Sequence, residues 1–279
     1  MVRIIADTLS CIPVDEAKAL GIPYIPQLII FGEDTYRDDT EINSATFLEK
    51  LHTSTELPKT AAPPPALYQP IFEEVMNNND TALVICPSAE LSGTYRSALV
   101  SAGDYPEADI RIVDTKTLAS GLGAIVLEAH QLAMGGSPAE GIIERIDFLS
   151  ARSRTYFLVD TLEYLHKGGR IGGAKALLGS ILQLKPILTL ENGQIESLES
   201  QRTHKRALAR LKELVFTQTA KTGQANVAVL QGDAEQEADS LARAIETELG
   251  QVNVPVYNLP PAILVHSGPG ALGVSFFTD

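Results

Sequence analysis

The chain has 279 residues, 44% of them hydrophobic and 20% charged, and its 35 acidic and 22 basic residues give a net charge of −13. This length allows two domains with sizeable cores. The negative charge disfavours non-specific binding to nucleic acid. No apolar run approaches the roughly 18 residues of a membrane span, so we expect no stable membrane insertion. The N-terminus lacks a signal-peptide pattern, and Cys11 and Cys86 predict buried thiols. Together these features predict a cytoplasmic protein.

The first half of the chain alternates short apolar runs with helical patterns. Helical periodicity covers 66–76 and 121–134, another helix starts near Ser137, and the proline-rich stretch Pro58–Pro65 predicts a stiff extended loop. Such alternation predicts an α/β domain over residues 1–157, with a mainly parallel sheet flanked by helices. The predicted strands are Arg3–Ala6, Ile25–Phe31, Ala82–Cys86, Ile110–Val113 and Tyr156–Val159.

The second half of the chain shows a different order of predicted strands and helices. Asn192-Gly193 lies between the apolar runs Pro186–Leu190 and Gln194–Leu198, which predicts an antiparallel hairpin. Two amphipathic helices follow, around Leu211 and Ile245. We therefore expect a second α/β domain, residues 158–279, with a mixed sheet. Its other predicted strands are Val227–Leu230, Val254–Tyr257 and Ile263–Val265.

A polar segment, Leu91–Ala98, follows the predicted strand that ends at Cys86. Ser92, Gly93 and Thr94 come where a helix begins, and a helix N-terminus offers free N–H groups and partial positive charge to an anion. A serine at this place can equally be a simple helix cap. The segment therefore indicates either an anion site or a cap.

A second polar segment, His266–Gly270, lies near the C-terminus. Gly268 to Gly273 match the spacing of a dinucleotide-binding fingerprint, but that fingerprint needs a following helix, and only six residues remain after Gly273. We reject the nucleotide interpretation. The remaining interpretations are a loop that approaches a ligand, with His266 at the end of a strand as its polar group, or an exposed turn.

Three further residues are candidates. Asp7 follows the first strand, where phosphatase-like folds place a nucleophile, but Leu9 stands where a second acid would be needed, so we interpret Asp7 as a cap or turn residue. The glycines at 168 and 169 end a helix and present Arg170, which suits contact with an anion or a partner. Arg202 belongs to a basic cluster that is either a solvated surface or a docking patch.

Taken together, these segments resemble the DegV family of bacterial fatty-acid-binding proteins. The resemblance covers nearly the whole chain and depends on the order of many short motifs. The motifs are Ile4–Asp7, Tyr24–Pro26, Tyr36–Asp38, Leu57–Thr60, Leu91–Ala98, Ile112–Asp114, Ser120–Gly123, Leu162–Ile171 and His266–Gly270.

The resemblance implies two α/β domains that bury a long-chain fatty acid and offer its carboxylate to a separate fatty acid kinase subunit. The binding protein would have no catalytic residue, no metal and no cofactor of its own, since ATP and magnesium would belong to the kinase. By position, Thr60, Ser92 and His266 would bind the carboxylate. Gly93 and Thr94 would support them, and Arg170 and Arg202 would lie where the kinase docks.

The chain departs from this family at one loop. Ala61-Ala62 replaces the usual Ser-Gln pair after the threonine, and Pro64 stands where another serine is common. Two side-chain donors are therefore missing near the predicted carboxylate site. Two alternatives stay open: a hydrolase or phosphatase centred on Ser92 or Asp7, and a binding module for another acidic metabolite.

Overall fold

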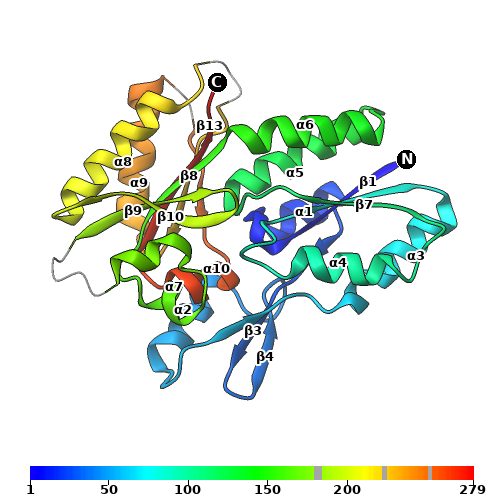
Figure 1. Cartoon of the computed structure of the whole chain (residues 1–279), viewed down its shortest axis with the longest axis horizontal. Helices are drawn as coiled ribbons and strands as arrows, with labels where there is room; N and C mark the ends of the chain where they lie inside the picture. Colours follow the sequence, from blue (N-terminus) through cyan, green and yellow to red (C-terminus); the bar gives the residue numbers. More distant parts are fainter. Residues whose placement is uncertain (179–183, 222–224, 251–252) are drawn as a thin grey trace.

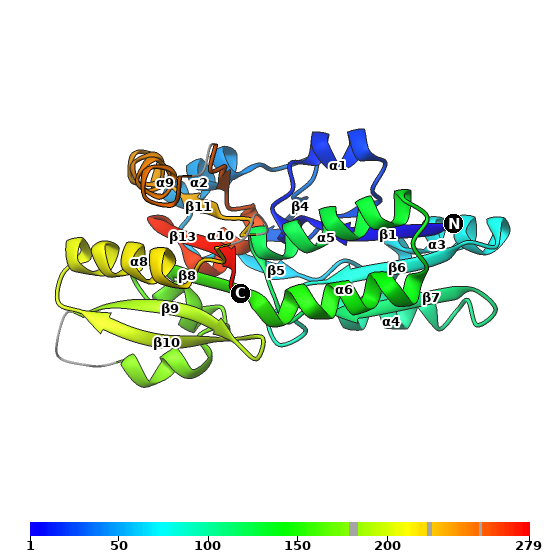
Figure 2. The same ribbon diagram turned by 90° about the horizontal axis from the view of Figure 1, so that it is seen from above.

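The computed structural model describes residues 1–178, 184–221, 225–250 and 253–279. Within them the chain forms a four-stranded, a six-stranded and a three-stranded sheet. The two larger sheets lie at opposite ends of the molecule, with the small sheet next to the centre (Figures 1 and 2). This α/β architecture agrees with the fold class that the sequence predicts.

The four-stranded sheet is parallel throughout. Alternate residues of its strands point to opposite faces, and both faces are covered: Ile4 packs with α1, α5 and α6, and Ile5 with α3 and α4. In spatial order the strands are β2 (Tyr24–Ile25), β1 (Val2–Asp7), β6 (Thr81–Cys86) and β7 (Asp109–Asp114); the helices are α1 (Val14–Leu20), α3 (Gln69–Asn78), α4 (Thr94–Ala102), α5 (Ala119–Met134) and α6 (Ala139–Arg152).

The six-stranded sheet is mixed, because β11 and β12 run parallel and its other neighbours antiparallel. The predicted hairpin is confirmed: Asn192 and Gly193 both have positive φ, as a tight two-residue turn requires. Helices α8 (His204–Gln218) and α9 (Glu235–Leu249) cover its outer face (Figure 1). In spatial order its strands are β10 (Gln194–Gln201), β9 (Lys185–Glu191), β8 (Ser153–Leu158), β13 (Ala271–Phe277), β11 (Ala228–Gly232) and β12 (Val256–Asn258).

The three-stranded sheet corrects two predictions. Its order is β4 (Asp34–Arg37), β3 (Leu28–Phe31) and β5 (Lys59–Ala61), all antiparallel. The run Ile25–Phe31 is thus two strands in two sheets. Pro26 has no N–H, and the Gln27 N–H goes to the Asp38 carboxylate instead of a neighbouring strand, so the chain leaves the parallel sheet there. The stretch Pro58–Pro65 is not one extended loop, since it contains β5.

Other predicted elements also change. Residues 156–159 were predicted among the strands of the first half, but β8 pairs antiparallel in the six-stranded sheet. Ile263–Val265 is not a strand: it lies in helix α10 (Pro261–Ser267), which begins at a proline, and a short apolar run does not distinguish the two by periodicity. The helix predicted over 66–76 is a 3₁₀ turn, η2 (Pro65–Leu67), followed by α3. The domain division at residues 157 and 158 stays a prediction, and β8 spans it.

A central apolar cluster joins the six-stranded and the three-stranded sheets. It combines Ile29 of β3, Phe47 of α2 (Ser44–Thr53), Leu165 of α7 (Glu163–Lys167), Leu188 of β9 and Leu264 of α10. The inner face of the six-stranded sheet therefore packs on these short elements and on the first turns of α5. Two further 3₁₀ helices are η1 (Thr8–Ser10) and η3 (Gly172–Leu177). Among the helices that the structure describes, none combines the length and apolar character needed to cross a membrane.

Candidate functional site

A cavity lies inside this central cluster. The cavity is partly open to solvent. Most of its wall is apolar, which suits a ligand with an apolar body and a few polar atoms. The larger apolar side chains are Leu9, Leu91, Leu118, Phe157, Leu165, Leu190, Ile195, Leu230, Leu259, Ile263 and Leu272; the polar ones are Gln27, Thr60, Ser92, Thr155, Arg170, His266 and Ser267.

Thr60 and His266 meet at this cavity although 206 positions separate them in the chain. Thr60 belongs to β5, and its Oγ1 lies 2.9 Å from Nε2 of His266 in α10. Burial, together with the nearby Arg170 charge, lowers the pKa of His266 to about 4, so the imidazole is neutral at pH 7. Its Nδ1 is buried and has no hydrogen-bond partner within the described structure. Gly168 lies against this nitrogen, where any Cβ would overlap the ring.

Ser92 and Thr94 are linked to each other at the start of α4. Their hydroxyl oxygens are 2.9 Å apart, and the Thr94 N–H donates to Ser92 Oγ over 3.2 Å. Gly93 occupies the cap position of the helix. A Cβ on Gly93 would stand 2.9 Å from the Cβ of Ala62, so the two backbones approach closely because residue 93 is glycine.

The Ala61-Ala62 departure falls at the cavity wall. Ala62 lines the cavity, whereas Ala61 pairs with Leu28 in the small sheet. Ala62 therefore presents a methyl group to the cavity. A polar side chain at this position would present a hydrogen-bond donor instead. Apart from Thr60, the polar side chains that line the cavity are held on other elements.

Arg170 faces the cavity and is half-buried. Its Nε donates to the Leu91 carbonyl over 3.0 Å, and its Nη1 to the Gly168 carbonyl over 2.7 Å. Burial lowers the pKa of Arg170. Arg170 thus ties the loop before α4 to the loop after α7. Arg202 is exposed between β10 and α8 and is not part of the cavity wall.

Behind Ser92 lies a buried polar chain that ends at Asp7. Thr94 Oγ1 is 2.9 Å from Asp7 Oδ2, and Gln27 Nε2 donates to Asp7 Oδ2 over 2.8 Å and to Thr94 Oγ1 over 3.0 Å. Asp7 also caps η1 by accepting the Leu9 N–H, which confirms its prediction as a cap. Burial raises the pKa of Asp7 to about 8. No role for Gln27 is predicted from the sequence, although Gln27 directly follows the motif Tyr24–Pro26.

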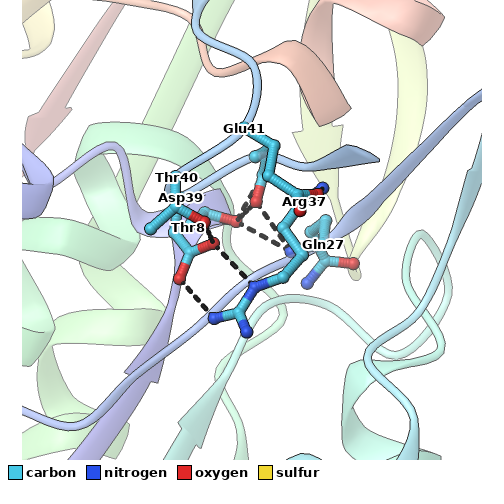
Figure 3. A network of polar contacts seen from close by, with 7 residues as sticks. Thr8, Gln27, Arg37, Asp39, Thr40 and Glu41 are labelled. Carbon is cyan, nitrogen blue, oxygen red and sulfur yellow. Dashed lines mark hydrogen bonds and ion pairs between the residues drawn. The ribbon is translucent and has the colours of Figure 1, made fainter. Parts of the chain in front are cut away.

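A second buried acid, Asp38, lies beside this chain. It accepts hydrogen bonds from the Thr8 hydroxyl and the Gln27 backbone N–H, and burial raises its pKa to about 7. Figure 3 shows Thr8 and Gln27 against the turn after β4, where the Arg37 guanidinium donates twice to Asp39. This turn fixes the position of Gln27 and therefore of the polar chain.

The hydrogen bonds of these side chains can be compared with what a hydrolase, a nucleotide site or a metal site would need. The hydrogen bonds of Ser92 both go to Thr94, and that of His266 goes to Thr60, so no serine–histidine pair forms among the described residues. Gly273 lies inside β13, so no helix follows the glycines of the terminal loop, which confirms that the nucleotide interpretation is wrong. In the part of the chain that the structure describes, no three His, Cys, Asp or Glu side chains group as metal ligands.

Comparisons of the sequence and of the structure with known proteins identify relatives from one family. The family model described as "Uncharacterised protein, DegV family" matches residues 1–279. A DegV domain-containing protein of Halalkalibacterium halodurans is 32% identical over 279 residues, which is 100% of this chain and 99% of the relative. One similar structure, titled as DegV, a fatty acid binding protein from Bacillus subtilis, has a TM-score of 0.89 at 30% identity, covering 100% of this chain and 99% of that one.

Another structure, titled as fatty acid binding of a DegV family protein from Thermus thermophilus, has a TM-score of 0.90 at 29% identity over 100% of this chain and 99% of that chain. The match in sequence and in fold thus extends from one end of this chain to the other, and the resemblance drawn from the sequence motifs is confirmed. The chain belongs to the DegV family.

Proposed function

We propose that this protein binds a long-chain fatty acid in the central cavity and presents its carboxylate to a separate fatty acid kinase, which phosphorylates it to an acyl-phosphate. The observation that carries the proposal is the lining of the cavity, which is mostly apolar and has a few convergent polar groups. The two similar structures, which are described as fatty-acid-binding proteins, support the same ligand class.

The carboxylate is held by Thr60, Ser92 and His266, with Gly93 and Thr94 in support. These side chains line the cavity or lie directly behind it, and Arg170 adds a positive charge nearby. Burying a sixteen-carbon chain contributes on the order of 10 kcal/mol of gross free energy, at roughly 0.8 kcal/mol per methylene. The polar groups then serve to orient the headgroup and to keep its charge from being buried without partners.

The protein acts as a binding protein and not as an enzyme. A hydrolase centred on Ser92 would need a base bonded to its hydroxyl, whereas that hydroxyl bonds to Thr94. A phosphatase centred on Asp7 would need an ionised carboxylate open to substrate, whereas Asp7 is buried and its pKa lies near 8. Arg170 and the exposed Arg202 remain the proposed contacts for the kinase.

The test is a titration of the protein with oleate, in which binding is monitored by the fluorescence of the protein or of a displaced probe. Wild-type protein should bind, and Ser92→Ala and His266→Ala should each weaken binding about tenfold to a hundredfold, because each removes a hydrogen bond to a charged group. Ser240→Ala is the matched control, since Ser240 is exposed on α9 and does not line the cavity. Unchanged oleate affinity in both site variants would contradict the proposed carboxylate site.

A further inference from the structure

The chain Asp7, Thr94, Ser92 leads from a buried acid to the wall of the cavity. Each neighbouring pair of oxygen atoms is 2.9 Å apart. Asp7 is 1% exposed and Thr94 is 1% exposed, so no bulk water competes for these bonds. Thr and Ser hydroxyls carry one proton each. The direction of every hydrogen bond in the chain is therefore fixed by whether Asp7 carries a proton.

When Asp7 is ionised, the Thr94 hydroxyl must donate to it. Thr94 Oγ1 then accepts from Gln27 Nε2 and from the Ser92 hydroxyl, so the only proton of Ser92 points away from the cavity. Ser92 Oγ already accepts the Thr94 N–H, and its remaining lone pair faces the ligand. In this state Ser92 repels a carboxylate.

When Asp7 is protonated, every bond in the chain reverses. The acid donates to Thr94, Thr94 donates to Ser92, and the Ser92 proton becomes free to donate to a carboxylate in the cavity. Gln27 Nε2 and the Thr94 N–H keep their acceptors in both states. Only this second state satisfies both Ser92 and an anionic headgroup.

We propose that Asp7 is a positioning residue that holds one proton for the ligand, so that Ser92 donates to the carboxylate only while Asp7 is protonated. The proposal rests on the proposed function. A fatty acid that enters in its neutral form passes its proton to Ser92, Ser92 passes its own to Thr94, and Thr94 passes its own to Asp7. One O–H bond breaks and one forms at each oxygen along the way, and the ligand is left as the anion that a kinase phosphorylates.

Burial makes the protonated state accessible at neutral pH, since it raises the pKa of Asp7 to about 8. The other titratable groups around Asp7 are Asp38 after β4, Cys11 after η1, Tyr24 on β2, Tyr68 before α3 and Cys86 on β6. Burial raises the pKa of all five, so the thiols and phenols stay neutral and Asp38 is the one neighbour that titrates near neutrality. At the cavity, His266 is neutral above pH 5 and Arg170 stays charged.

The test is the pH dependence of laurate binding, measured by calorimetry well below the micelle concentration of laurate. Because the carboxylate form needs one proton on Asp7, we expect wild-type affinity to be about tenfold weaker at pH 9 than at pH 7. In Asp7→Asn, the Leu9 N–H selects the amide oxygen, so an amide N–H₂ takes the place of Asp7 Oδ2 and can donate to Thr94 as the protonated acid does. The Gln27 amide then turns over, so that its oxygen and not its nitrogen faces this N–H₂. This variant should bind equally at both pH values.

Two variants and one ligand complete the design. Thr94→Val interrupts the chain and removes the oxygen that accepts the Ser92 proton when Asp7 is ionised, so its laurate binding should no longer depend on pH. Asp38→Asn is the matched control: it removes the other buried acid but leaves the path from Asp7 to Ser92 intact, so the loss of affinity at pH 9 should remain. The corresponding fatty alcohol, which has no charge, should bind wild type equally at both pH values.

Two results would overturn the inference. If wild type binds laurate equally at pH 7 and pH 9, or if Asp7→Asn loses affinity as wild type does, Asp7 does not control Ser92, although fatty-acid binding itself would stand. If wild type does not bind laurate at any pH, the proposed function fails and the inference fails with it.

Discussion

The two sides of the cavity differ in where their side chains come from. The apolar side is built from strand interiors of the six-stranded sheet, such as Phe157, Leu190 and Leu230. The polar end is built mainly from the ends of elements and from loops, such as Gln27 between β2 and β3 and Ser92 before α4. A strand interior offers rigid apolar surface, whereas element ends offer free backbone groups and side chains that can converge.

This difference has an energetic counterpart. The apolar side chains of the cavity wall also belong to the central core of the protein, so substitutions there should first lower the free energy of unfolding. The polar end carries buried groups that hydrogen-bond to one another, with His266 Nδ1 as an exception among the described residues, so changes there should affect pH dependence and ligand orientation. The predictions below separate these effects, from the largest to the smallest.

Asp7→Asn should change stability most, and only in a defined pH range. The folded protein keeps the Asp7 proton up to about pH 8, whereas an unfolded aspartate loses it near pH 4. Wild-type stability therefore falls as pH rises between these values, by at most about 6 kcal/mol. The variant should be more stable than wild type at pH 8 and nearly equal at pH 4. Urea unfolding at both pH values measures this, and an equal difference at the two would contradict it.

Leu230→Ala should destabilise the protein by about 2–5 kcal/mol and also weaken oleate binding, because Leu230 is buried in the core and lines the cavity. Leu211→Ala is the matched control: it is equally buried under the outer face of the same sheet, in the cluster that α8 and α9 form. The control should lose similar stability and keep its oleate affinity. Loss of affinity in both variants would show that the apolar side acts through stability alone.

Thr60→Val should weaken oleate binding by about 1–2 kcal/mol while stability changes less. The substitution keeps the shape of the side chain but removes the hydroxyl that bonds to His266 Nε2, and it leaves both imidazole nitrogens of His266 without a protein partner. Calorimetric titration and thermal unfolding of the same samples check both quantities. A large loss of stability with unchanged affinity would mean that the Thr60–His266 bond is purely structural.

Arg202→Ala should have the smallest effect on the protein itself. Because Arg202 is exposed and outside the cavity wall, unfolding free energy should change by less than about 0.5 kcal/mol and oleate affinity should stay the same. Phosphorylation of the bound fatty acid by a partner kinase should nevertheless slow, if Arg202 lies where the kinase docks. The exposed Arg243 on α9 provides the matched control, and equal rates in both variants would remove Arg202 from the proposed interface.

The sequence predicted the polar end better than the apolar side, for a physical reason. Ser92 and Thr94 were visible because polar residues follow a buried strand and open a helix, and His266 was visible beside the terminal glycine loop. Thr60 came from the family resemblance. The apolar lining was not predictable, because Val229 and Leu230 are adjacent apolar residues of one predicted strand, and the sequence does not show which of them faces the cavity. His266 was expected at a strand end but lies in α10, since a short apolar run between prolines fits either element.

The hydrogen-bond partners of the buried acids could not be predicted from the sequence either. Asp7 reads as a cap and is one, but its second role depends on Gln27 and Thr94, which reach it from 20 and 87 positions away. That proximity exists because Pro26 ends β2 and Gln27 turns toward Asp38. Local propensity contains no information about such long-range contacts.

Native mass spectrometry of the freshly purified protein tests the central claim most directly, when it is followed by solvent extraction and identification of any released molecule. The account predicts a discrete adduct that extracts as a long-chain fatty acid, and loss of that adduct in Ser92→Ala and His266→Ala. A mass equal to that of the bare chain, with no uptake of added palmitate or oleate, would contradict it.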